Sequence, residues 1–181
     1  NPINSFYVYQ QVYDEKGKYT HIANAAGYPN PVSLLEISNE TTQDRILAQA
    51  YIEIIPFKDL LLKAQFGYDK QTAKVEFYLP RTTLYGEKEG GYGTINQSQL
   101  EDKLLSYTAN YKKTFKEKHR FYLLLEYECQ ITNRRSQDMN VSSFPSDSSG
   151  TNGMGDGKGR PVIDSSRSLV EFASYFGRVN Y

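Results

Sequence analysis

The stretch RILAQAYIEIIPFKDLLLKAQFGYD, residues 45–69, decides the fold of this chain because its apolar residues recur at every second position. From Ile46 to Ile54 every second residue is apolar, and Arg45 and Glu53 are among the residues between them. Side chains alternate across a strand, so this period of two predicts strands rather than helices. The segment Pro56–Asp59 interrupts the pattern as a tight turn would. The stretch therefore predicts an antiparallel hairpin with one apolar and one mostly polar face.

The same alternation continues further along the chain, in residues 105–112, 121–132 and 173–181. A second tight turn is predicted at Lys116–His119, between two of these segments. The sequence thus predicts an all-β fold of antiparallel β-hairpins, with about five or six strands and almost no helix.

Long polar stretches, about residues 71–103 and 133–167, separate the hairpins and are predicted to be surface loops. Loops of that length are uncommon in compact soluble domains. Strands of roughly ten residues, joined by short turns at one end and long loops at the other, are typical of a transmembrane β-barrel. We therefore expect residues 1–181 to form a single, partial β-barrel domain, whose apolar face meets lipid.

The composition excludes several other classes of protein. The chain has 21 basic and 21 acidic residues, so its charge points to no nucleic-acid partner. Cys129 is the only cysteine, which excludes an internal disulfide and a cysteine-based zinc site. No apolar run approaches the roughly 18 residues of a membrane helix, and no signal peptide is recognisable. Neither observation argues against barrel strands, which never appear as continuous apolar runs.

A soluble β-sandwich would show the same alternation, with the apolar face turned toward a second sheet. The alternative function is accordingly that of a soluble binding module, such as a carbohydrate-binding one. Such a module needs exposed aromatic platforms, whereas Phe66, Tyr107, Tyr127 and Tyr175 all lie in the apolar register. Solubility without detergent would separate the two hypotheses.

Two motifs near the ends of the chain carry a resemblance to a known family. Residues 27–45, GYPNPVSLLEISNETTQDR, resemble the SusC/RagA family just after its plug domain, where an Asn-Pro-Val-x-Leu-Leu segment leads into an early barrel strand. Residues 165–181, SSRSLVEFASYFGRVNY, resemble a strand that the family uses further on. The resemblance covers about residues 28–181.

The resemblance implies a TonB-dependent transporter in the bacterial outer membrane. The family forms a barrel of about 22 strands, closed by a plug and covered by a SusD-like surface lipoprotein. It imports oligosaccharides or peptides with energy relayed through TonB. No TonB box, plug or closing strand is recognisable here, so we expect a barrel fragment that transports nothing alone and needs partner strands at its edges.

Polar residues between the apolar positions are predicted to line the barrel lumen. The candidates are Arg45, Gln49, Glu53, Lys63, Gln65, Asn110, Lys112, Glu126, Glu128, Arg178 and Asn180.

We predict no catalytic residue, no cofactor and no metal site, and hence no enzyme. Glu126 and Glu128 have a spacing that could suit paired carboxylates, but a polar lumen explains them better. The glycine-rich residues 153–159 lack the spacing of a phosphate-binding loop and are expected to form a mobile surface loop. A loose external calcium site in residues 138–166 is left open.

Overall fold

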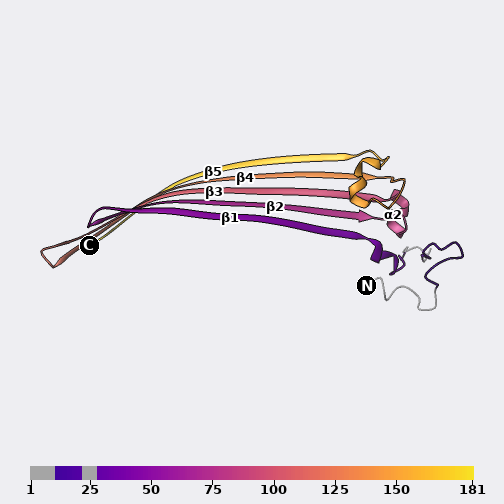
Figure 1. Cartoon of the computed structure of the whole chain (residues 1–181), viewed down its shortest axis with the longest axis horizontal. Helices are drawn as coiled ribbons and strands as arrows, with labels where there is room; N and C mark the ends of the chain where they lie inside the picture. The colour runs from indigo at the N-terminus through magenta and orange to yellow at the C-terminus, as the bar shows by residue number, and fades with distance from the viewer. Residues whose placement is uncertain (1–10, 22–27) are drawn as a thin grey trace. The chain divides into compact units, whose positions relative to one another are not determined.

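The computed structural model describes residues 11–21 and 28–181, and its strands form one open antiparallel sheet (Figure 1). The order in the sheet is β1-β2-β3-β4-β5, so each strand pairs with its neighbour in the sequence. The strands are β1 (Ser38–Phe57), β2 (Leu60–Leu79), β3 (Tyr92–Phe115), β4 (His119–Ser142) and β5 (Val162–Asn180). The prediction of an all-β partial barrel is confirmed. Because all five strands share one sheet, the described residues form no sandwich.

In residues 11–21 and 28–181, helical structure is confined to short segments. They are the 3-10 helices η1 (Ser33–Glu36) and η2 (Gly150–Asp156) and the α-helix α2 (Leu84–Glu89). None of the helices in the part of the chain that the structure describes has the length and apolarity that crossing a membrane requires.

Both predicted hairpins are present, with turns slightly shorter than expected. Pro56 belongs to β1, which leaves Lys58 and Asp59 as the first turn. In the second turn Lys116 and Glu117 have φ angles of 49° and 59°. Two successive left-handed residues define a type I′ turn, whose twist matches the flanking strands. These are not the glycine or asparagine that such a turn favours, so this turn is locally strained.

The strands extend further than the sequence analysis expects. The predicted loops at about 71–103 and 133–167 shrink to residues 80–91 and 143–161, because β2, β3, β4 and β5 all continue into them. Runs that are polar on both faces, residues 96–99 in β3 and 133–138 in β4, interrupt the apolar periodicity, although Val75, Phe77 and Leu79 of β2 do alternate with polar residues. Polar side chains pair across the strands there instead, as Asn96 does with Asp138 and Thr132 with Asp102. Such cross-strand pairs stabilise two neighbouring strands even where neither face of the sheet is apolar.

The chain forms two compact units, and each strand contributes residues to both. Among the described residues, the first unit comprises 11–21, 28–42, 73–97 and 136–165, and it contains the two longer connections. The second unit comprises residues 43–72, 98–135 and 166–181, and it contains the two tight turns.

The first unit has a small buried core, which we call the cap cluster: Tyr78, Val141, Phe144 and Met154. The rings of Tyr78 and Phe144 meet edge to face at 5.2 Å. Met154 sits in η2, inside the glycine-rich segment predicted to be a mobile loop. Met154 is buried in the core, so the segment is anchored at this point, while its mobility elsewhere stays a prediction. Glycine also lets the segment approach β4 closely. Gly159 shows this, since its N–H donates to the Ser142 carbonyl at 2.9 Å.

We expect Gly159→Ala to destabilise the cap cluster by about 1–3 kcal/mol. A Cβ there would lie 2.4 Å from Ser142 Oγ and 2.9 Å from its backbone oxygen, and the backbone cannot move aside cheaply. Gly155→Ala is the matched control, because a Cβ at Gly155 meets nothing within 4 Å. Limited proteolysis of residues 143–161 compares them. Equal cleavage of the two variants would contradict the packing described here.

Candidate functional site

The polar face of the sheet in the second unit carries paired charges between β1 and β2. Arg45 Nε donates to Asp69 Oδ1 at 3.0 Å, and Arg45 Nη2 donates to Asp69 Oδ2 at 2.7 Å. Gln71 also donates to Asp69, at 3.2 Å. The two parallel bonds hold the guanidinium and the carboxylate in one plane. Arg45 is therefore committed to a partner within the sheet rather than free to receive a solute.

Further along the same two strands, Lys63 Nζ lies 3.7 Å from Glu53 Oε1. The ammonium also lies 4.6 Å from the centre of the Tyr51 ring. Side chains that touch across neighbouring strands share a face of the sheet. Glu53, Lys63 and Tyr51 thus occupy the same face, as the alternation predicts for all three.

Four other candidates gather near the end of the strands. Asn110, Lys112, Arg178 and Asn180 border a shallow groove of about 200 Å³. Lys112 Nζ lies 5.7 Å from the centre of the Tyr122 ring, and Arg178 Nε donates to the Asn180 side chain at 3.4 Å. The structure brings these candidates together, although they come from β3 and β5.

The remaining candidates take no part in these contacts. Gln49 is exposed, whereas Gln65, Glu126 and Glu128 are half-buried. No group of three His, Cys, Asp or Glu side chains that could hold a metal ion occurs among the described residues. The assignment of all eleven candidates to a lumen stays a prediction.

The opposite face in the second unit is aromatic and apolar. The Tyr107 and Tyr127 rings stack at 6.4 Å, and the Tyr127 and Tyr175 rings lie 4.9 Å apart. This row of rings crosses β3, β4 and β5 on one face. Leu125 is 50% exposed and Ile52 is 70% exposed. Apolar side chains left so open on a sheet need a cover, which could be lipid or protein.

Further along the strands this apolar face changes to a polar one, a boundary that the predicted alternation does not mark. Arg167 Nε donates to Asn133 Oδ1 at 3.1 Å, and Lys103 Nζ lies 3.1 Å from Glu101 Oε1. These residues continue the apolar register of Tyr107, Tyr127 and Tyr175 along their strands. Lys103 and Glu101 continue the register of Tyr107 toward the start of β3, and their charge is the sequence signal for this boundary.

Tyr78 of the cap cluster also takes part in a partly buried polar contact that the sequence did not reveal. Asp147 accepts from the Tyr78 hydroxyl at 2.9 Å and from Arg81 N and Nε, each at 3.1 Å. Burial, together with the bond to Asp147, raises the pKa of Tyr78 well above its ordinary value. Asp147 is thus already bonded to protein donors, which weakens its candidacy as a calcium ligand.

A cleft of about 560 Å³ lies beside this contact in the first unit. Tyr13, Tyr19, Glu36 and Arg81 are among its lining residues. Tyr19 donates to Glu36 at 2.7 Å, and this bond raises the pKa of Tyr19. The rings of Tyr13 and Tyr19 lie 4.9 Å apart. The carboxylates lining the cleft at Glu36 and Asp147 are bonded to neighbouring hydroxyl or guanidinium groups, which does not suit a general base.

No family model matches this chain. A TonB-dependent receptor, P26 of Formosa agariphila, is 25% identical over 180 residues, which cover 95% of this chain and 18% of the receptor. The chain thus spans about a fifth of the length of the relatives it matches.

Solved structures of the RagAB peptide importer and transporter have the same fold. In the closed-closed state the TM-score is 0.74 at 21% identity, over 84% of this chain and 17% of the RagAB chain. In the open-open state it is 0.70 at 21% identity, over 96% and 20%. The predicted resemblance is therefore confirmed: this chain is similar in sequence to part of a TonB-dependent receptor and similar in fold to part of RagAB.

Proposed function

We propose that this chain forms part of the barrel wall of a TonB-dependent transporter in the bacterial outer membrane. One observation carries the proposal: a single antiparallel sheet exposes an apolar face with a row of tyrosines and, opposite it, a face of paired charges. A barrel wall needs both faces, because lipid contacts one and water the other. The similarity to a TonB-dependent receptor over 95% of the chain supports the same conclusion.

The proposed cargo is an oligosaccharide or a peptide. RagAB is a peptide importer, which favours the peptide. A SusD-like surface lipoprotein and TonB are the proposed partners, the first covering the barrel and the second supplying energy. Neither the receptor nor the importer is named as an enzyme, and the polar contacts described above contain no nucleophile paired with a base.

Leu125 and Glu126 provide a test of the two faces at one depth in the sheet. In a Cys129→Ser background, we expect a membrane-impermeant maleimide to label Glu126→Cys and to spare Leu125→Cys in the full protein in its native membrane. The reason is that adjacent residues of a strand point to opposite faces, one toward the lumen and one toward lipid. Mass spectrometry of the intact protein measures the labelling.

Ile52→Cys and Glu53→Cys repeat the comparison on β1. Denatured samples of all four variants should label equally, which controls for thiol reactivity. Equal labelling of both faces in the membrane would refute the barrel wall, and so would reversed labelling.

A further inference from the structure

Basic residues concentrate at the two tight turns of the second unit. We call this set the basic rim: Lys58, Lys112, Lys113, Lys116, Lys118 and Arg120. The two segments that contain these residues, 58–59 and 112–120, have only two acidic residues, Asp59 and Glu117. The whole chain has equal numbers of basic and acidic residues, so the rest of it is net negative. The positive charge is therefore localised rather than general.

The basic rim borders a groove of about 340 Å³. Lys58, Lys112, Lys113 and Arg120 line it together with Phe121 and Tyr122, so residues of both faces of the sheet meet at this groove. The Lys112 N–H donates to the Asp59 carbonyl at 2.8 Å, which holds the ends of β2 and β3 together under the groove. Its walls are thus fixed by backbone as well as by side chains.

Most of the positive charge at the groove is uncompensated. Lys113 forms an ion pair with Asp59. No ion pair within the described part of the chain involves Lys58, Lys116, Lys118 or Arg120. All four of these side chains are exposed. Lysine and arginine near one another repel, so a rim of this kind favours an anionic partner.

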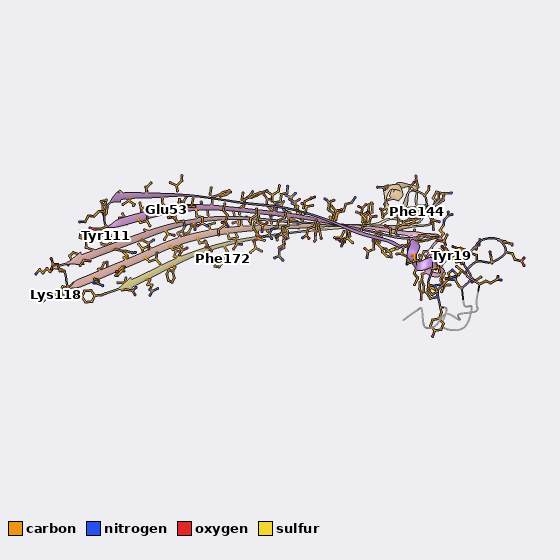
Figure 2. All side chains as sticks on the ribbon, turned by 60° about the horizontal axis from the view of Figure 1, so that its bottom comes forward. Tyr19, Glu53, Tyr111, Lys118, Phe144 and Phe172 are labelled. Carbon is orange, nitrogen blue, oxygen red and sulfur yellow. The ribbon has the colours of Figure 1, made fainter. Side chains whose placement is uncertain are left out.

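Aromatic rings adjoin the basic rim. The Tyr111 ring meets that of Phe57 at 6.5 Å and that of Phe121 at 6.4 Å, both nearly edge to face. Figure 2 shows Tyr111 and Lys118 near the same end of the strands in this unit. Aromatic side chains in a barrel wall gather at the level where acyl chains meet headgroups. A free anion would not require them, whereas a lipid would contact both the rings and the charges.

We propose that the groove of the basic rim binds the phosphate of anionic phospholipid headgroups in the periplasmic leaflet. This inference rests on the proposed function, since the short turns of an outer-membrane barrel face the periplasm. Lys58 and Arg120, which line the groove, hold the phosphate by charge together with Lys116 from the adjoining turn. The Phe121 ring, which also lines the groove, lies against the upper acyl chains with its neighbour Tyr111. The contact would fix the depth of the barrel wall in the bilayer.

The test uses the full protein as the cell makes it, reconstituted in nanodiscs of equal phosphatidylglycerol and phosphatidylcholine. Native mass spectrometry measures which lipid is retained. We expect preferential retention of phosphatidylglycerol that weakens as salt rises. The variant Lys58→Gln/Lys116→Gln/Arg120→Gln should lose roughly tenfold or more of that preference, since each basic residue contributes at an anionic surface.

The matched control is Lys88→Gln/Lys158→Gln/Arg160→Gln, which removes the same charges from the longer connections and should keep the preference. An unchanged preference in the basic-rim variant would overturn the inference, as would displacement of phosphatidylglycerol by millimolar inorganic phosphate. Insertion without any lipid preference refutes the inference and leaves the proposed function standing. Failure to insert at all refutes the proposed function itself.

Discussion

Leu125→Arg is expected to destabilise the protein by about 2–4 kcal/mol in a bilayer, if this position lies near the midplane. Leu125 lies on the face that carries Tyr127 and Tyr175, and it is already 50% exposed within the sheet. A guanidinium there would have to enter hydrocarbon, where no water or carboxylate compensates its charge. Urea unfolding of the full protein in lipid vesicles measures the loss.

The control substitution is Glu126→Arg, at the next residue of β4 and hence on the opposite face. On a face lined by water this change should alter stability by less than about 0.5 kcal/mol. An equal loss in both variants would mean that neither face contacts lipid. A larger loss for Glu126→Arg would reverse the proposed facing.

Phe144→Ala is expected to cost about 3 kcal/mol of local stability in the cap cluster. Phe144 is only 4% exposed and packs against Tyr78 and Gly93. Removing the ring leaves a cavity in a core too small to close around it. Because this core belongs to the first unit, the effect should be local opening of residues 143–161 rather than global unfolding.

Hydrogen exchange of two backbone amides reports this opening directly. The Phe144 N–H donates to the Gly90 carbonyl at 2.8 Å, and the Lys158 N–H donates to the Ser143 carbonyl at 3.0 Å. Both amides should exchange faster in Phe144→Ala. Phe115→Ala removes a phenylalanine that is 49% exposed and should leave them protected. Unchanged exchange in Phe144→Ala would show that the ring does not hold the segment.

The hairpins could be predicted because two local signals coincide in each. Around Pro56–Asp59 the alternation of apolar residues fixes the strands and the break in it fixes the turn. The extension of β3 back to Tyr92 and of β4 to Ser142 could not be predicted in the same way, because residues 96–99 and 133–138 are polar on both faces. There, a strand is stabilised by polar partners on the neighbouring strand, such as Asp138 for Asn96. The identity of those partners depends on register, which apolar periodicity does not encode when both faces are polar.

The faces of the sheet were also predictable, whereas the contacts on them were not. Alternation places Glu53 and Lys63 on the polar side, but the ion pair between them follows from the pairing of β1 with β2. Asp147 is a sharper case. Its partners Tyr78 and Arg81 lie 69 and 66 residues away in the sequence, so no local pattern could reveal that its charge is already matched.

The sheet order β1-β2-β3-β4-β5 also sets the sequence of events by which the sheet forms. Every strand pairs with the next one along the chain, so no pairing has to wait for a distant segment to arrive. Closing a turn at Lys58–Asp59 or Lys116–Lys118 loses less chain entropy than closing residues 143–161. The hairpins β1–β2 and β3–β4 should therefore form first. The pairing of β2 with β3 and of β4 with β5, across the longer connections, should follow. Nascent chains would then reach a folding partner as preformed hairpins rather than as single strands.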